Sequence, residues 1–398
     1  MVGGVETYVR RLAQGLAQRA VPVTVVTPTP GATKDDAKLP FRVVRQPGFI
    51  KLVKLLRQAE VIHLAGPCLL PLGLAILLRK PVVIEHHGYQ AICPNGLLLF
   101  EPSGTVCPGH FMARQYTKCL RCNASNVGLF KSLVQLLLTF PRRWASQRAT
   151  VNLPITFHVE NRLHLPRSRV IYYGIPDPYE GSECAFGFGG VPSQLGPPMF
   201  AYVGRLVAEK GLTVLLQSAK ELVDTGYSFR LKIIGEGPER TKLENVVDSL
   251  GLEGRVSFLG SLAGELLANE LKAAAAVVMP SVWEETAGLS AIEQMMRGGA
   301  VIASDIGGLG EVVGEAGLKF TTGDVAGLAS CLRRLLDDSG LTKTLGAKAR
   351  KRAVELFSQE RMVQEHLGLY HKLAGNFPPG LRQSPLCSPK GNNIISRR

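Results

Sequence analysis

The chain has 398 residues, of which 45% are hydrophobic and 20% are charged, and its formal net charge at pH 7 is +14. This length exceeds one ordinary hydrophobic core and predicts two domains of about 150–200 residues each. The positive charge favours anionic partners such as phosphates, nucleotides or acidic lipid headgroups. The basic residues are dispersed and no nucleic-acid-binding motif accompanies them, which argues against a protein that binds RNA or DNA.

The first half of the chain alternates between helical and strand patterns, which is typical of an α/β domain. We expect a helix over residues 4–18 and strands over residues 23–26, 61–64, 82–84, 151–153 and 170–172. The apolar stretch 69–78 is too short to span a bilayer and predicts a buried helix. Because no long apolar core precedes Arg10, we expect no signal peptide and a cytoplasmic location.

The chain opens on Gly3-Gly4, a turn that a doubly wound domain normally reaches after its first strand. We therefore expect the first N-terminal strand to be missing, either because translation starts further upstream or because the gene is truncated. Such a loss would expose a strand edge in the N-terminal sheet.

The second half predicts another α/β domain. We expect strands over residues 200–203, 231–234, 256–259, 275–279 and 300–303 and helices over residues 209–222, 238–250 and 288–297. Asp324 predicts the N-cap of a helix that runs through Leu336, and Ser358 predicts that of a last helix over residues 359–373. The predicted organisation is an N-terminal domain 1–178 with a cysteine-bearing insertion 88–127, a linker 179–198, a C-terminal domain 199–357, a crossover helix 358–374 and a disordered tail 375–398.

Two carboxylates, Glu285 and Glu293, lie where a strand of the second domain gives way to its helix. Glu285 precedes the helix and Glu293 lies inside it, with seven residues between them. Ligands of parallel sheets bind beyond the carboxyl ends of the strands. We therefore expect both carboxylates to contact a polar ligand.

Arg205 and Lys210 lie at the strand-to-helix junction that opens the second domain. A guanidinium gives a diphosphate forked hydrogen bonds, and an ammonium gives it a point charge. The competing interpretation is two surface cations near the start of a helix, but a helix N-terminus disfavours cations unless an anion is present. The pair therefore predicts a phosphate site.

Glycine turns close several of the predicted strands. Gly235-Glu236-Gly237-Pro238 is only a fragment of the G-x-G-x-x-G motif, because Arg240 occupies the third glycine position. These two glycines favour a tight turn under a nucleotide base or ribose. The backbone N–H groups of Gly307-Gly308 are expected to hold a phosphate oxygen, and Gly3-Gly4 makes the same kind of turn across a cleft.

Together these motifs resemble those of the retaining glycosyltransferases of family 4, also called glycosyl transferases group 1, which have a GT-B fold. The resemblance extends over about residues 3–373 and rests on Gly204-Arg205-Leu206 with Glu209-Lys210-Gly211, on Gly235-Glu236-Gly237-Pro238, on Glu285 and Glu293, and on Asp305-Ile306-Gly307-Gly308. It implies two Rossmann-like doubly wound domains with a nucleotide-sugar cleft between them. The N-terminal domain would hold the acceptor.

The resemblance also implies roles for individual residues. Arg205 and Lys210 would neutralise the leaving diphosphate, Glu285 would contact the donor sugar, and Glu293 would contact the ribose. The implied donor-binding residues are Gly3, Gly4, Gly204, Arg205, Lys210, Gly235, Gly237, Glu285, Gly288, Leu289 and Glu293. Because the chain has no Asp-x-Asp pair to hold a divalent metal on the diphosphate, we expect a metal-independent reaction without a cofactor.

Glu85-His86-His87-Gly88 follows the strand predicted over residues 82–84 and resembles the histidine motif of the same family. The spacing to Cys93-Pro94 points to His87 as the matching position, where it would hydrogen-bond the donor sugar near the reacting carbon. The aspartate that often follows this histidine is replaced by Gly88, which leaves its role open. The alternative is a polar loop histidine.

Cys93, Cys107, Cys119 and Cys122 lie within thirty residues, and the last two have Cys-x2-Cys spacing. Four thiolates in a loop-rich insertion can bind structural zinc or form a disulfide clamp, and free buried thiols are the alternative. A similar insertion occurs in some members of the family. We expect no catalytic role for these residues.

Residues 130–148 combine apolar and basic side chains in the pattern of a basic amphipathic helix. Such a helix can lie on an anionic membrane surface, which would suit a lipid-linked acceptor. The alternative is a core-facing helix with a solvated basic end.

The sequence therefore predicts a retaining hexosyltransferase that moves a sugar from a nucleotide-diphosphate sugar to a saccharide or lipid-linked saccharide. We expect it in the cytoplasm, in peripheral contact with the inner face of the membrane, in cell-envelope or exopolysaccharide synthesis. Two other classes compete with this prediction. A Rossmann dehydrogenase would lack its full glycine motif, and a non-catalytic nucleotide-sugar binder would be a truncated relative.

Overall fold

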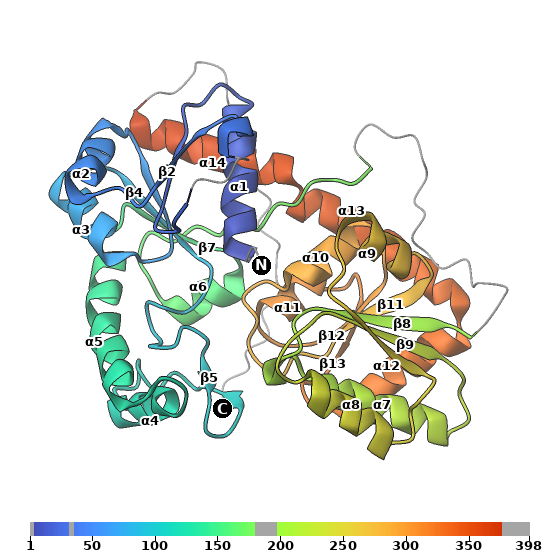
Figure 1. Cartoon of the computed structure of the whole chain (residues 1–398). Coiled ribbons are helices and arrows are strands. Elements are labelled where there is room, and N and C mark those ends of the chain that lie inside the picture. Colours follow the sequence, from blue (N-terminus) through green and yellow to red (C-terminus); the bar gives the residue numbers. More distant parts are fainter. Residues whose placement is uncertain (1–3, 32–35, 180–196, 376–398) are drawn as a thin grey trace, which may run out of the picture.

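The computed structural model describes residues 4–31, 36–179 and 197–375, which form two α/β domains (Figure 1). The expected tail lies outside these residues except for Gly375. Of the expected linker, only Tyr179 and residues 197–198 are described. In the described part of the chain, no helix is both long enough and apolar enough to cross a membrane.

The C-terminal domain is built on one six-stranded parallel sheet. Its strands are β8 (Met199–Val203), β9 (Arg230–Ile234), β10 (Val256–Gly260), β11 (Ala274–Met279), β12 (Val301–Ser304) and β13 (Leu318–Phe320). Their order in the sheet is β10-β9-β8-β11-β12-β13, so the winding direction reverses between β8 and β11. Ligands of doubly wound sheets bind beyond the carboxyl ends of the strands at such a reversal.

Helices cover both faces of this sheet (Figure 1). They are α7 (Leu212–Asp224), α8 (Arg240–Ser249), α9 (Gly264–Leu271), α10 (Leu289–Met296), α11 (Gly307–Val313), α12 (Val325–Asp337) and α13 (Ser339–Phe357). Successive strand residues point to opposite faces, so Ala201 packs in one hydrophobic cluster and Phe200 and Tyr202 in the other. Burial on both faces explains why these strands are continuous apolar runs in the sequence.

In the N-terminal domain, the described parallel strands form two separate sheets. One pairs β1 (Thr24–Thr27) with β2 (Arg42–Arg45), and the other has the order β3 (Ile62–Ala65), β4 (Val82–His86), β7 (Val151–Pro154). Among the described residues, β1 and β3 therefore each have a strand partner on one side only. A short antiparallel hairpin, β5 (Leu99–Phe100) and β6 (Thr105–Val106), belongs to the insertion.

The strand predicted over residues 170–172 is wrong. This segment is extended, but its only ladder contacts are isolated bridges at Ser168 and Ile175. Ile171 and Tyr173 are buried in the core, whereas Val170 and Tyr172 are half-buried. Arg169 N and Ile171 N donate to Asn152 O and Pro154 O of β7, so the segment runs beside the sheet without forming a regular strand of it.

The helices of the N-terminal domain surround these strands. They are α1 (Gly4–Ala17), α2 (Phe49–Gln58), α3 (Leu69–Leu77), α4 (Tyr116–Val127), α5 (Leu129–Ser146) and α6 (Phe157–Leu163). The buried helix predicted over residues 69–78 is only partly correct, because Leu72 and Ala75 are fully buried whereas Leu70 and Leu77 are exposed. The helix α3 carries apolar side chains on all sides, but only one side is buried against the domain.

The last described helix, α14 (Gln359–Ala374), returns to the N-terminal domain and packs against α1 (Figure 1). Tyr8 Oη lies 3.1 Å from His366 Nε2 across this contact. Gly15 allows the close approach, because a Cβ there would lie 2.4 Å from Val363 Cγ2. The predicted N-caps are confirmed: the side chain of Ser358 accepts from the backbone N–H of Arg361, and Asp324 caps α12 in the same way.

Candidate active site

Glu285 and Lys210 meet beyond the carboxyl ends of β8 and β11, where the strand order reverses. Lys210 Nζ lies 3.0 Å from Glu285 Oε1, and the hydroxyl of Ser281 donates to the same oxygen. Glu285 is only 7% exposed. A buried carboxylate is tolerated only with a paired charge and hydrogen bonds, so these two partners fix the position of the Glu285 carboxylate.

Arg205 follows β8 and is the exposed cation of the site. Its side chain is 64% exposed, and its nearest carboxylate is that of Glu209, with Nη2 and Oε1 4.0 Å apart. A pair at that distance on the surface contributes little. The guanidinium is therefore available to an anion, whereas the ammonium of Lys210 already contacts Glu285.

Two of the predicted glycines bring the loops after β8 and β9 into backbone contact. A Cβ on Gly235, whose φ is +145°, would lie 1.8 Å from Gly204 O, and one on Gly237 would lie 2.2 Å from Leu206 O. Leu206 N donates to Glu236 O at 2.9 Å in the same contact. Only glycine permits this approach, so both residues position the loop that carries Arg205.

The turn at Gly307-Gly308 supports the backbone of Glu285. Gly308 N donates to Glu285 O at 2.7 Å, and a Cβ on Gly308 would lie 2.1 Å from Thr286 O. The prediction that these N–H groups hold a phosphate oxygen is therefore wrong for Gly308, whose donor is already used. A strand-end glycine pair in sequence does not distinguish an anion site from a turn that supports a neighbouring loop.

Glu293 lies on α10 and faces the N-terminal domain. Its Oε1 lies 3.7 Å from Arg11 Nη2 on α1, and its side chain is 34% exposed. Nearby, a Cβ on Gly4 would lie 3.0 Å from Leu289 Cδ1, which brings the start of α1 against the start of α10. Gly288, with φ +70°, begins that helix. Gly3 lies outside the described residues.

Glu284 joins the two domains beside Glu285. Its Oε2 lies 3.0 Å from Arg162 Nε and 3.3 Å from His158 Nε2, both on α6. Tyr89 in the insertion donates its hydroxyl to Glu284 O at 3.2 Å. The sequence prediction did not include these contacts, and the only signal was the adjacent pair of glutamates.

Glu311 on α11 makes a second contact between the domains. Its two carboxylate oxygens accept from the backbone N–H groups of Phe157 and His158 at 2.9 and 2.7 Å, and Oε1 also accepts from Tyr172 Oη at 2.7 Å. A carboxylate at the first turn of a helix satisfies N–H groups that have no partner within the helix. The C-terminal domain thereby caps α6 of the N-terminal domain.

His87 follows β4 and lies in a buried polar cluster. Its Nδ1 is 2.5 Å from Tyr173 Oη, and its Nε2 is 3.6 Å from Glu85 Oε2. Burial lowers the pKa of His87, although the Glu85 charge opposes this. Burial alone would raise the pKa of Glu85, but His87 and His63 hold it at about 2. Within this cluster Glu85 is therefore the charged acceptor.

His86 points to the opposite side of β4 and bonds Asn152 instead, with Nε2 2.9 Å from Oδ1. Burial lowers its pKa to about 4, so it is neutral at physiological pH. The sequence predicted His87 rather than His86 as the histidine of the site. Of the two, His87 is the one whose ring lies next to Tyr8 of α1, with ring centroids 5.2 Å apart.

The chain matches known proteins over both domains. Residues 189–352 match the family model of glycosyl transferases group 1, and residues 2–176 match that of Glycosyltransferase Family 4. The chain is 34% identical over 358 residues to the 2-deoxystreptamine glucosyltransferase of Streptomyces kanamyceticus, covering 84% of this chain and 89% of that protein. It is 28% identical over 360 residues to the 2-deoxystreptamine N-acetyl-D-glucosaminyltransferase of Streptomyces fradiae, covering 82% and 81%.

Solved structures resemble the whole architecture. The sucrose-phosphate synthase from Thermosynechococcus elongatus aligns with a TM-score of 0.68 at 24% identity, covering 94% of each chain. The Anabaena protein HepE, solved in complex with UDP-glucose, aligns with a TM-score of 0.66 at 19% identity, covering 94% of this chain and 97% of that one. The predicted fold class is confirmed: two α/β domains in the GT-B arrangement.

Proposed function

Because the chain belongs to the glycosyl transferases group 1 family, we propose that it is a retaining, metal-independent glycosyltransferase. It moves a hexose-type sugar from a nucleotide-diphosphate sugar to a saccharide acceptor. The observation that carries this proposal is the contact of 3.0 Å between Lys210 Nζ and Glu285 Oε1 at the point where the strand order reverses. It puts a cation for the diphosphate beside a carboxylate for the sugar.

Arg205 and Lys210 stabilise the leaving diphosphate. When the glycosidic bond to the phosphate breaks, negative charge develops on the diphosphate, and fixed cations there lower the barrier. The exposed guanidinium of Arg205 can form two parallel hydrogen bonds with phosphate oxygens. These two side chains take the place of a divalent cation, because the sequence has no Asp-x-Asp pair to hold one.

Glu285 orients the donor sugar. In the described part of the chain, Lys210 and Ser281 both contact its Oε1, which leaves Oε2 to accept from sugar hydroxyls. Glu293, at the other end of the same segment, accepts from the ribose hydroxyls of the nucleotide, and the turns at Gly235, Gly237 and Gly288 lie under the nucleotide. Retention follows when the departing phosphate accepts the acceptor's proton on the same face of the sugar.

His87 contacts the donor sugar near its reacting carbon. Its Nε2 is buried and has no hydrogen-bond partner among the described residues. Tyr173 holds the ring through Nδ1, and the Glu85 carboxylate lies 3.6 Å from Nε2, beyond hydrogen-bond distance. A buried ring nitrogen without a partner is costly, and a substrate hydroxyl would satisfy it.

The acceptor is either a small soluble cyclitol or a lipid-linked saccharide. The first is supported by the relatives whose names specify 2-deoxystreptamine. The second is supported by α5, whose exposed apolar side chains are Leu129, Phe130, Leu133, Val134, Leu137, Phe140 and Trp144. The core-facing alternative for this helix is wrong for those residues.

The same helix carries Lys131, Arg142 and Arg143, and Arg148 after it lies over the Trp144 ring at 3.8 Å. A helix of this composition binds anionic lipid headgroups. Binding of α5 to such lipids would place the enzyme at the inner face of the membrane, in cell-envelope or exopolysaccharide synthesis. Transfer to 2-deoxystreptamine, compared with transfer to a lipid-linked saccharide in vesicles, separates the two acceptor classes.

The proposal is tested with a panel of UDP-, GDP- and ADP-sugars. We expect one of them to raise the thermal midpoint and to support transfer, with the anomeric configuration retained in the product. Glu285→Gln should abolish transfer while preserving most nucleotide binding, and Glu253→Gln, on the exposed surface, serves as the matched control. Binding without any transfer would favour a non-catalytic nucleotide-sugar binder, and the absence of both would contradict the donor site.

A further inference from the structure

Four cysteines of the insertion lie around one small cavity. Cys93 follows the His87 segment, Cys107 follows β6, and Cys119 and Cys122 lie on α4. All four are buried, and together with His110 they line a cavity of about 10 Å³. A space of that size holds a single atom-sized occupant.

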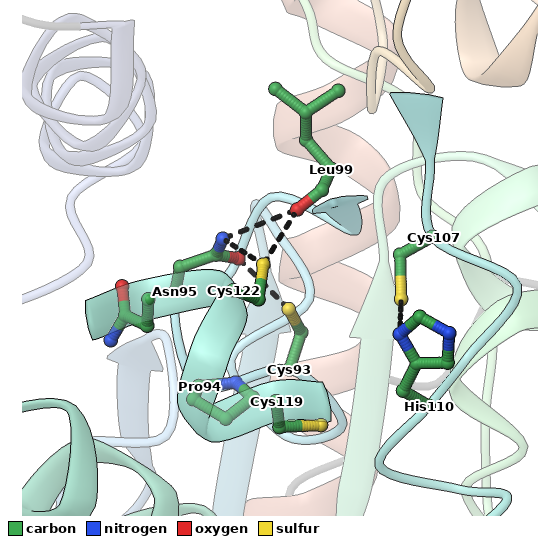
Figure 2. A pocket seen from close by; sticks show the side chains of 9 residues that line it. Cys93, Pro94, Asn95, Leu99, Cys107, His110, Cys119 and Cys122 are labelled. Atoms are coloured by element: carbon green, nitrogen blue, oxygen red, sulfur yellow. Dashed lines mark hydrogen bonds between the residues drawn. The ribbon is translucent and has the colours of Figure 1, made fainter. Parts of the chain in front are cut away.

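The side chains approach this space from separate segments. Figure 2 shows Cys93 and Cys122 on one side of it and Cys107 with His110 on the other. Cys107 Sγ lies 3.4 Å from His110 Nδ1. All four thiols are free of disulfide bonds in this structure. The cavity is therefore lined by soft ligands from three parts of the chain.

We propose that Cys93, Cys107, Cys119 and Cys122 bind one structural Zn²⁺ in this cavity. Zinc prefers four-coordinate tetrahedral sites, and a set of four thiolates with a Cys-x2-Cys pair on a helix is typical of its structural sites. Each thiol releases its proton to solvent as its sulfur bonds the metal, so no oxidant or reductant is needed.

The sulfurs must turn inward to bind the metal. Among the described residues, no group of three His, Cys, Asp or Glu side chains already surrounds a single point. Two of the sulfurs bond other groups that line the cavity: Cys93 Sγ donates to Asn95 Oδ1 at 2.9 Å, and Cys122 Sγ donates to Leu99 O at 3.3 Å. Thiols are weak hydrogen-bond donors, so side-chain rotation breaks only weak contacts.

Cys122 also has the surroundings of a metal-bound thiolate. The backbone N–H of Glu101 donates to its sulfur at 3.4 Å, and Asn95 Nδ2 donates to it at 3.8 Å. Hydrogen bonds of this kind orient the ligands of metal sites and balance the charge of the sulfur. They favour a thiolate ligand over a disulfide sulfur, which carries no charge.

The start of the insertion, with Tyr89, Ile92 and Leu98, packs into the main core, but the part around α4 has few buried apolar residues. The hairpin strands of the insertion have two residues each, and the buried part of the apolar cluster at α4 consists of Phe111, Cys119 and Leu136. Small units with few buried apolar residues are usually stabilised by disulfides or a metal.

The cluster is also connected to the candidate active site. Arg162 Nη2 donates to Cys107 O at 2.8 Å, and Nε of the same side chain lies 3.0 Å from Glu284 Oε2. The metal would thereby fix the loop that holds Arg162 against the segment carrying Glu284 and Glu285.

The test is metal analysis of the full chain purified without added metal or chelator. We expect about one zinc per chain, released on titration with a mercurial that reacts with thiols and detected with a zinc-sensitive dye. Cys119→Ser should lose the zinc and lower the thermal midpoint. Cys68→Ser, which removes an exposed thiol at the start of α3, should keep both.

The wild-type measurement stands even if Cys119→Ser fails to fold. Absence of zinc, with all four cysteines alkylated after denaturation without reductant, would overturn the proposal in favour of free thiols. Absence of zinc, with a mass lower by the hydrogens lost to disulfides, would overturn it in favour of a disulfide clamp. Iron in place of zinc would also contradict it.

Discussion

Arg162 Nε lies 3.0 Å from Glu284 Oε2, across the boundary between the two domains. Arg162 comes from α6 of the N-terminal domain, and Glu284 comes from the loop after β11 of the C-terminal domain. Because Glu284 directly precedes Glu285, the ion pair couples the relative position of the domains to the segment that is proposed to hold the donor sugar.

Arg162→Gln should therefore weaken the contact between the domains. The substitution leaves the carboxylate of Glu284, whose side chain is 14% exposed, without its arginine. We expect the free energy of unfolding to fall by about 1–3 kcal/mol, the cost of an unsatisfied polar group. Thermal unfolding measures this, and Arg57→Gln, an exposed residue of α2, is the matched control. Equal midpoints for both variants would contradict the prediction.

Lys210→Met should reduce catalysis more than folding. Removing one group that stabilises charge in a transition state lowers kcat by about 10²–10³, and here it also removes the partner of Glu285. Steady-state transfer kinetics measure the loss. Lys220→Met, which removes a surface lysine paired with Asp224, should retain wild-type kcat. Lys210→Met with unchanged kcat would remove Lys210 from the mechanism.

Two helical glycines should respond oppositely to alanine. At Gly15 in α1 the new Cβ would lie 2.4 Å from Val363 Cγ2, so we expect Gly15→Ala to destabilise by about 1–3 kcal/mol. At Gly368 in α14 nothing lies within 4 Å, so we expect Gly368→Ala to stabilise by about 0.5–1 kcal/mol. Denaturant unfolding measures both. Stabilisation by Gly15→Ala would contradict the packing of α1 on α14.

His366 should make the protein less stable in mild acid. It is fully buried, with Nδ1 2.8 Å from Met362 O and Nε2 3.1 Å from Tyr8 Oη, a pair of contacts that suits the neutral ring. Burial lowers its pKa to about 4, against the opposing charge of Glu85. The neutral His366 ring therefore contributes its full stability above the unfolded pKa of about 6.5. This contribution is lost as the pH falls towards 4.

Between pH 8 and pH 5 we expect this group to cost about 2 kcal/mol of unfolding free energy. His366→Gln, which can still accept from Tyr8, should make this part of the curve less steep, while His86, whose pKa burial also lowers to about 4, keeps its own contribution. His164→Gln, at an exposed position with no described tertiary contact, should leave it unchanged. Identical pH profiles for wild type and His366→Gln would show that other groups are responsible.

The C-terminal domain could be predicted well from the sequence because both faces of its sheet are buried. Its strands are short apolar runs, and five of the six were predicted to within one or two residues. β13 was missed because Leu318–Phe320 is only three residues long. In the N-terminal domain α4 was missed because its exposed residues interrupt any apolar period, and α6 was missed because it spans seven residues.

The candidate site was predictable only where its residues follow the ends of recognisable strands. Arg205, Lys210 and Glu285 follow strands of one domain, and the structure brings the latter two into contact. Glu284 and Arg162 are far apart in sequence and belong to different domains, so no local pattern connects them. The apolar spacing that predicted a strand over residues 170–172 belongs to a segment that hydrogen-bonds to β7 only irregularly.

The packing of α1 against α14 also has a consequence for how the protein is made. Tyr8 and His366, which meet in the folded chain, are 358 positions apart. At a synthesis rate of about 5–20 residues per second, α14 leaves the ribosome tens of seconds after α1. Throughout that interval α1 can pack on His87 and Tyr173 of its own domain, but it lacks the partners that α14 supplies. The packing of α1 is therefore completed only after α14 has been made, although α1 precedes it by most of the length of this sequence.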